Sequence, residues 1–177
     1  KLGLINNSLY ASDLSQGAVD CSIKNAKMHK IPHDVRVGSL FEPWINEKFD
    51  YIVNDVSGVA AEIAILSPWF KNVPCASGAD GTDLVVKVLS EAPNYLLKGG
   101  QFFFPVISFS KVDNILSIAN KSFSNVERLT HNQWPLPDDM KIHTDKLYEL
   151  KEKGHIEFEE KFGMIIWYTD IYVGSNS

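Results

Sequence analysis

The sequence has few cysteines, no excess of basic side chains and no long apolar run. Its two cysteines, Cys21 and Cys75, are too few for a disulfide framework or a zinc cluster, so we expect both to be reduced thiols that are buried or partly buried. Seventeen basic residues against 22 acidic ones leave a net charge of −5, which disfavours nucleic acid as a partner but leaves room for a local basic patch. No apolar run approaches the ~20 residues of a membrane span. We therefore expect a soluble, cytoplasmic protein with no membrane contact.

Several motifs with a known chemistry are also missing. The sequence contains neither the Gly-x-x-x-x-Gly-Lys-Ser/Thr loop of P-loop nucleotide hydrolases nor the Gly-x-Ser-x-Gly turn of serine hydrolases. The histidines are scattered without the spacing of metal ligands: His29, His33, His131, His143 and His155. We therefore expect no metal centre.

The length and composition of the chain are typical of one globular domain. The chain has 177 residues, of which 45% are hydrophobic and 22% charged, a balance typical of a folded soluble domain. It opens at Lys1 rather than at Met and enters a strand-like stretch within a few residues. We expect a single domain over 1–177 that is truncated at its N-terminus.

Strand-like and helix-like stretches alternate along the chain. We expect strands over residues 8–12, 34–37, 49–53, 101–107, 126–130 and 163–173. We expect helices over residues 16–30, 59–66, 82–96, 112–121 and 145–153. Such alternation indicates right-handed crossovers and a mostly parallel sheet in an α/β fold of three layers.

Local signals refine some of these elements. Ser15 and Thr82 are expected to be helix N-caps, and Pro93 is expected to kink or end the third helix. The segment Lys98–Gly100 is expected to form a turn. The apolar run Phe102–Ile107 after it predicts a strand that is buried on both faces.

Two aspartates follow expected strands. In open α/β sheets ligands bind beyond the carboxyl ends of the strands, so both positions are candidates for a site. Asp13 can accept hydrogen bonds from the two hydroxyls of a ribose, or it can cap the following helix. Asp55 can position a reacting group or an ammonium group, or it can serve as a turn residue. Position alone leaves both alternatives open for each aspartate.

A succession of short stretches resembles the class I S-adenosylmethionine-dependent methyltransferases. The stretches that carry the resemblance are Tyr10–Ser15, Asn25–Ala26, Val37–Glu42 and Phe49–Asp55. The later stretches Ser77–Leu84 and Leu96–Phe102 are similar to the HemK-like branch, the protein-glutamine N5 methyltransferases and related small-methyltransferase domains. The resemblance runs from about Leu9 to Val106. It implies a Rossmann-like sheet, mostly parallel with an antiparallel C-terminal strand, that lacks its first strand and glycine-rich loop in this sequence.

The resemblance implies S-adenosylmethionine as the cofactor and assigns residues to it. Asp13, with Leu14 beside it, matches the acidic position that binds the ribose hydroxyls. Ser39 and Leu40 match the pair beside the adenine, but Ser39 lacks the carboxylate often found there. Asp55 matches the first residue of an Asn/Asp-Pro-Pro-Tyr motif and is assigned both to the cofactor and to catalysis. We expect Asp13 and Asp55 to lie at neighbouring strand ends.

The acceptor side of the expected site departs from the family. The motif is Asp55-Val56-Ser57-Gly58, without either proline and without the aromatic residue that packs on a planar acceptor. In an enzyme of this kind we expect Asp55 to orient the acceptor nitrogen and either to take its proton or to stabilise positive charge on it, and we expect Ser57 to add a hydrogen bond. The implied reaction is methyl transfer to a nitrogen of a protein side chain or of a small molecule. A nucleic-acid base methyltransferase and a non-catalytic binding module remain as alternatives.

Overall fold

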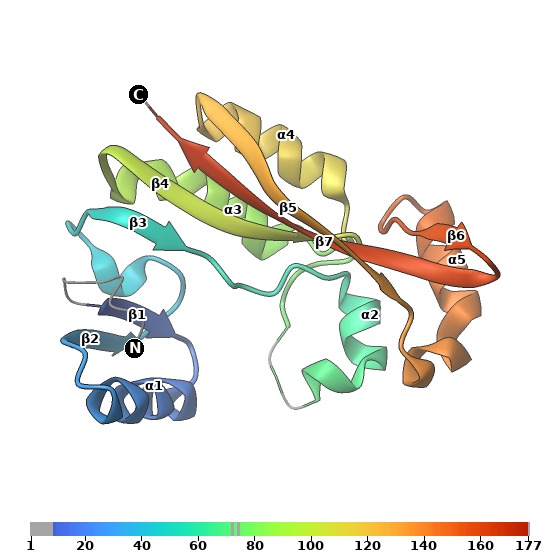
Figure 1. Cartoon of the computed structure of the whole chain (residues 1–177), viewed down its shortest axis with the longest axis horizontal. Coiled ribbons are helices and arrows are strands. Elements are labelled where there is room, and N and C mark those ends of the chain that lie inside the picture. The colour runs from blue at the N-terminus through green and yellow to red at the C-terminus, as the bar shows by residue number, and fades with distance from the viewer. Residues whose placement is uncertain (1–8, 72, 74, 177) are drawn as a thin grey trace. The chain divides into compact units, whose positions relative to one another are not determined.

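The computed structural model describes residues 9–71, 73 and 75–176. The chain divides into two compact units, Lys1–Glu47 (the N-terminal unit) and Lys48–Ser177 (the C-terminal unit). Each unit is described by itself below (Figure 1). Ser8, at the start of the first expected strand, lies outside the described residues. The expectation of a single domain stays a prediction.

The N-terminal unit is a strand–helix–strand unit. Strand β1 (Leu9–Asp13) pairs in parallel with β2 (His33–Val37), and helix α1 (Gln16–Met28) connects them. The expected N-cap is confirmed, because the Ser15 hydroxyl accepts a hydrogen bond from the amide of Ala18. A short 3₁₀ helix, η1 (Glu42–Trp44), follows β2, and the Trp44 indole donates to the hydroxyl of Ser12 at 2.9 Å.

The C-terminal unit is built on a mixed sheet with the strand order β3-β4-β7-β5. Its strands are β3 (Phe49–Val53), β4 (Leu96–Ile107), β5 (Asn125–Pro135), β6 (Glu159–Lys161) and β7 (Met164–Ser175). β3 and β4 are parallel, whereas β7 runs antiparallel to β4 and β5 and also pairs with β6. The predicted antiparallel C-terminal strand in an otherwise parallel arrangement is confirmed.

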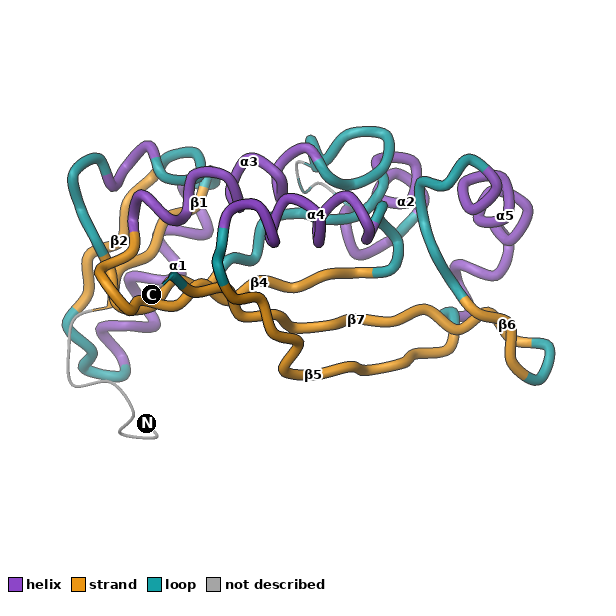
Figure 2. Tube along the Cα trace, turned by 90° about the horizontal axis from the view of Figure 1, so that it is seen from above, coloured by secondary structure: helices purple, strands orange, loops and turns teal. Residues whose placement is uncertain are grey.

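Helices of this unit cover one side of the sheet. The described helices are α2 (Ala61–Leu66), α3 (Asp83–Glu91), α4 (Val112–Ser122) and α5 (Thr144–Glu152), with 3₁₀ helices η2 (Pro68–Phe70), η3 (Ala92–Tyr95) and η4 (Asp138–His143). Figure 2 shows α3 and α4 together on one side of β4 and β7. Within the described part of the chain, no helix combines the length and the apolar character needed to cross a bilayer.

Strand β4 is buried more on one face than on the other. Phe102, Phe104 and Val106 are fully buried, whereas the residues between them are half-buried. Phe102 stacks on Phe123, the residue that follows α4, with 5.7 Å between ring centroids. The prediction of a strand buried on both faces is wrong for the second face, which is only half-buried, because α3 and α4 lie on one side of this strand.

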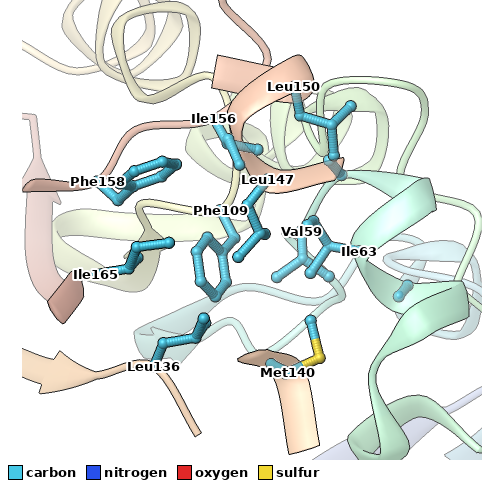
Figure 3. Close-up of a cluster of buried hydrophobic side chains, with 12 residues drawn as sticks. Val59, Ile63, Phe109, Leu136, Met140, Leu147, Leu150, Ile156, Phe158 and Ile165 are labelled. Carbon is cyan, nitrogen blue, oxygen red and sulfur yellow. The ribbon is translucent and has the colours of Figure 1, made fainter. Parts of the chain in front are cut away.

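An apolar cluster packs α2 and α5 against the end of the sheet where β4 ends and β7 begins (Figure 3). It gathers side chains from distant parts of the unit, among them Val59, Ile63, Phe109, Met140, Leu147, Leu150 and Ile165. The ion pair between Lys146 of α5 and Glu62 of α2, at 2.8 Å, spans the same two helices. This cluster fixes the segment that leads from β3 into α2.

Some local expectations need correction. Helix α3 ends at Glu91, as Pro93 predicted, but the Thr82 side chain caps no amide of it and instead donates to Asp80. The expected turn at Lys98–Gly100 lies within β4, where Gly99 has a φ of +77° and the register against β3 shifts. A glycine at positive φ lets the strand absorb extra residues as a bulge without ending.

Candidate functional site

Asp13 ends β1 and starts the turn into α1. Its carboxylate oxygen Oδ1 accepts a hydrogen bond from the amide of Ser15 at 2.7 Å, and its backbone carbonyl accepts one from Gly38 at 3.1 Å. Asp13 is thus an Asx-turn residue, while the cap of α1 is Ser15. The side chain is exposed, and its Oδ2 has no hydrogen-bond partner among the described residues. One carboxylate oxygen therefore remains for a ligand.

The segment after β2 lies at the same end of the N-terminal unit. Asp13 and Val37 are register partners, and the Ser12 hydroxyl donates to the carbonyl of Leu40 at 3.4 Å. The structure therefore brings Asp13, Leu14, Ser39 and Leu40 to one end of the β1–β2 pair. Leu14 is 65% exposed, which leaves its side chain free to contact a ligand.

The backbone of this segment is unusual. Leu40 has a φ of +50°, a conformation that is uncommon for a residue with a large side chain. A side chain at Gly38 would collide with the ring of Pro43, since an added Cβ would lie 2.3 Å from its Cγ. Such strained positions cluster at functional sites, and here the strain falls on a residue that the resemblance places beside adenine.

Asp55 follows β3 in the C-terminal unit. The amide of the preceding residue, Asn54, donates to the carbonyl of Phe103 at 2.8 Å and so extends the β3–β4 ladder up to Asp55. The Asp55 carboxylate accepts no hydrogen bond from any residue that the structure describes. Surrounding protein atoms remove part of its hydration, which raises the pKa of the Asp55 carboxyl above its ordinary value while the residue stays exposed.

Asn54 lies at the same strand end as Asp55, and sequence reasoning assigned no role to it. It is 7% exposed, and its Oδ1 accepts a hydrogen bond from the amide of Val56 at 3.3 Å. Its Nδ2 is buried and has no partner within the described ranges. A buried donor without a partner costs about 1–3 kcal/mol, so this amide destabilises the segment after β3. The signal in the sequence was a second polar residue directly before Asp55.

Ser57 is joined to Cys75 and Ser77. The Ser57 Oγ lies 2.7 Å from the Cys75 Sγ, which in turn lies 3.2 Å from the Ser77 Oγ. The Ser77 hydroxyl donates to the carbonyl of Val59 at 2.5 Å. Both cysteines of the chain are free thiols. Cys75 is half-buried, as predicted, whereas Cys21 is exposed, so the prediction that it is at least partly buried is wrong. Sequence reasoning singled out Ser57 but not its partners, because Cys75 is 18 positions away.

The structure thus groups the candidate residues in two sets. Asp13, Leu14, Ser39 and Leu40 belong to the N-terminal unit, whereas Asp55 and Ser57 belong to the C-terminal unit. The expected proximity of Asp13 and Asp55 stays a prediction. Among the residues that the structure describes, no group of three or more His, Cys, Asp or Glu side chains is arranged to hold a metal ion.

Two curated proteins match the chain in sequence. The ribosomal protein uL3 glutamine methyltransferase of Bradyrhizobium diazoefficiens is 32% identical over 101 residues, which cover 54% of this chain and 32% of that protein. The release factor glutamine methyltransferase of Geobacter sulfurreducens is 34% identical over 91 residues, which cover 49% of this chain and 32% of that protein. The chain spans about a third of the length of these relatives. No family model matches the chain.

Solved structures match the fold over nearly the whole chain. The arsenic (III) S-adenosylmethionine methyltransferase of Chlamydomonas reinhardtii has a TM-score of 0.55 at 14% identity, over 95% of this chain and 55% of that one. At this identity the likeness concerns the fold alone. The chain therefore has the class I methyltransferase fold, and its predicted resemblance to the HemK-like glutamine methyltransferases is confirmed.

Proposed function

We propose that the protein is an S-adenosylmethionine-dependent methyltransferase that acts on a side-chain nitrogen of another protein. One observation carries this proposal: the Asp55 carboxylate, just after β3, has a raised pKa and no hydrogen-bond partner among the described residues. A partly desolvated carboxylate without a structural partner is poised to bind a donor group or a proton. The matched relatives are named for glutamine methylation of a ribosomal protein and of a release factor, which supports a protein acceptor.

The residues of the N-terminal unit fit the adenosine part of the cofactor. The free Oδ2 of Asp13 is an acceptor for ribose hydroxyls, and the exposed side chain of Leu14 offers apolar contact. Ser39 supplies no carboxylate for the adenine amino group, so recognition of the base falls to the backbone and to Leu40. The residues of the N-terminal unit therefore fit a nucleoside, and we expect them to bind the base more weakly than the sugar.

The residues of the C-terminal unit fit the acceptor. When bound, S-adenosylmethionine supplies a methyl group activated by a sulfonium. Asp55 accepts a hydrogen bond from an N–H of the acceptor, which orients the nitrogen lone pair and raises its nucleophilicity. Its raised pKa makes Asp55 a better recipient for the proton that leaves the nitrogen. Positioning of this kind accounts for up to about 7–11 kcal/mol of barrier reduction.

Titration calorimetry with S-adenosylmethionine on the natural protein tests the cofactor assignment. We expect a Kd in the micromolar range, about −8 kcal/mol. The acceptor is then sought by incubating the protein with methyl-labelled cofactor and separate protein and RNA fractions of cells. Label in the protein fraction supports the proposal, and label in the RNA fraction favours base methylation instead. Absence of cofactor binding would identify a non-catalytic module and would overturn the proposal.

A further inference from the structure

The turn between β6 and β7 carries an aromatic residue where its backbone favours a small polar one. β6 ends at Lys161 and β7 begins at Met164, so the loop of this hairpin consists of Phe162 and Gly163. Both residues have a positive φ, +53° and +72°, as in a type I′ turn. Asn, Asp or Gly is preferred at the first of these positions, because a residue with a large side chain is strained there. The turn itself therefore supplies no reason for Phe162.

The core of this chain supplies no reason for Phe162 either. Its side chain is 97% exposed, the highest value among the large apolar side chains that the structure describes. Figure 2 shows the turn between β6 and β7 at one end of the C-terminal unit. A strained backbone that presents an exposed aromatic ring is typical of a surface that contacts another molecule.

A groove lies beside this turn. It has a volume of about 210 Å³. Small-molecule sites in proteins usually measure roughly 300–1,000 Å³, so this groove suits a single large side chain better than a free ligand. Most of the residues that line it are apolar and come from β5, β7 and the turn: Trp134, Pro135, Phe162, Met164 and Ile166.

The charged residues beside the groove balance each other. Lys161 Nζ lies 2.5 Å from the Glu159 carboxylate and donates to Gln133 Oε1 at 3.1 Å. Glu160 is the register partner of the buried Ile165, so it belongs to the opposite face of the hairpin. The whole chain has a net charge of −5, so two copies repel each other on average. Beside the groove, one charge of each sign removes this repulsion and offers no excess charge to a strongly basic or acidic partner.

We propose that the hairpin patch, meaning the groove residues together with Glu159, binds a second copy of this chain in a two-fold dimer. Identical surfaces meet in such a dimer, so one patch must supply both a protruding group and a recess that receives it. Phe162 is the protruding group, and the groove beside it is the recess. Phe162 of each copy enters the groove of the other, and the pair of Lys161 and Glu159 meets its own copy without an excess of like charge.

This inference goes beyond the proposed function and does not depend on it. The hairpin patch contains none of the residues assigned to the cofactor or to the acceptor. Dimerisation can therefore be measured without cofactor and without acceptor.

Sedimentation velocity of the natural protein between about 1 and 300 μM tests the dimer. We expect a dimer Kd on the order of 10 μM, because one aromatic anchor per copy makes a small interface. Phe162→Asn removes the anchor and gives the turn its preferred residue type. The dimer Kd should therefore rise at least about tenfold, while the Tm of the monomer, measured at low concentration, stays the same or rises.

Two further variants make the result specific. Ile65→Asn is the matched control, because Ile65 is 81% exposed on α2 and lies outside the hairpin patch. It loses an exposed apolar side chain of similar size and should leave the dimer Kd unchanged. Met164→Lys places a charge in the groove and keeps Phe162, so it should also raise the dimer Kd at least about tenfold. This second variant decides the question if Phe162→Asn does not fold.

Several outcomes would overturn the inference. One is a natural protein that stays monomeric up to about 300 μM, including a monomer whose hairpin patch is covered by a different protein. Another is a Phe162→Asn or Met164→Lys variant that folds and dimerises as tightly as the parent. All three variants should keep the Kd of the parent for S-adenosylmethionine. Absence of cofactor binding by the parent would therefore count against the proposed function alone.

Discussion

Two aspartates of the C-terminal unit show how differently the fold treats a carboxylate. Asp170 on β7 is 2% exposed and binds His131 Nδ1 at 2.6 Å and Arg128 at 3.4 Å, with the Tyr172 hydroxyl 3.5 Å away. Asp55 after β3 is exposed and receives no hydrogen bond from the described residues. A carboxylate with a full set of partners holds strands together, whereas one without partners adds nothing to stability and remains available to a ligand.

Replacing Asp55 should give the largest effect on activity and almost none on stability. We expect Asp55→Asn to lower kcat for methyl transfer by about 10²–10⁴-fold, because the amide is a poorer acceptor and cannot take a proton. The Tm should stay within a few degrees of the parent value or rise, since a partly desolvated charge is removed. Steady-state kinetics and thermal unfolding measure the two quantities.

Asp50→Asn is the matched control for this variant. Asp50 is an exposed carboxylate on β3 itself, five positions before Asp55. The same chemical change there should leave kcat and Tm unchanged. Equal activity of Asp55→Asn and the parent protein would remove Asp55 from the acceptor site.

Replacing Asp170 should give the reverse pattern. We expect Asp170→Ala to lower the free energy of unfolding by about 1–3 kcal/mol, because buried hydrogen bonds between β5 and β7 are lost. The cost stays below that of a fully buried ion pair, since His131 and Arg128 retain side-chain exposures of 37% and 52%. Urea unfolding measures the loss, and the cofactor Kd of the folded fraction should not change. A Kd that rises with the loss of Asp170 would contradict a purely structural role.

The elements of the fold were largely predictable where local signals are strong. The strand Phe49–Val53 and the N-cap Ser15 were predicted as observed, because a short apolar run and a hydroxyl before a helix act over a few positions. Lys98–Gly100 was predicted as a turn and lies inside β4, since β4 pairs with β3 on both sides of this segment and absorbs the glycines as a bulge.

The candidate site was predictable only in part, for a related reason. Asp55 could be selected from the sequence because it follows an apolar strand. Its position in the sequence does not show that its carboxylate accepts no hydrogen bond from the described residues. The hydrogen bonds that join Ser57 to Cys75 and Ser77 depend on a contact between residues 18 positions apart, which no sequence periodicity predicts. Side-chain networks of this kind require coordinates, whereas the strand ends that carry them do not.

Asp13 is intermediate between Asp170 and Asp55, because one of its carboxylate oxygens accepts a hydrogen bond within the protein and the other does not. Asp13→Asn keeps an Oδ1 for the amide of Ser15 but loses the negative charge for ribose hydroxyls. We expect it to weaken cofactor binding by about tenfold with little change in stability. Asp13→Ala should weaken binding similarly and also lower the free energy of unfolding by about 1 kcal/mol. Calorimetry and urea unfolding separate the two roles, and equal unfolding curves for both variants would contradict the turn role.

The smallest expected effect is a shift in the pH profile. An ordinary aspartate has a pKa of about 3.9, and partial desolvation raises the pKa of the Asp55 carboxyl above it. As the pH is lowered, we therefore expect kcat/KM to start falling at a higher pH than an ordinary aspartate would cause.

The effect of this raised pKa on the free energy of unfolding is opposite in sign to that of a paired carboxylate. A raised pKa in the folded state means that folding binds the proton more tightly, so ionised Asp55 destabilises the fold above that pKa, and this cost disappears as the pH falls below the unfolded value. Unfolding of the parent protein and of Asp55→Asn across pH 3–8 should therefore converge at the acid end and separate above it, with the variant more stable. Parallel curves would contradict the raised pKa of the Asp55 carboxyl.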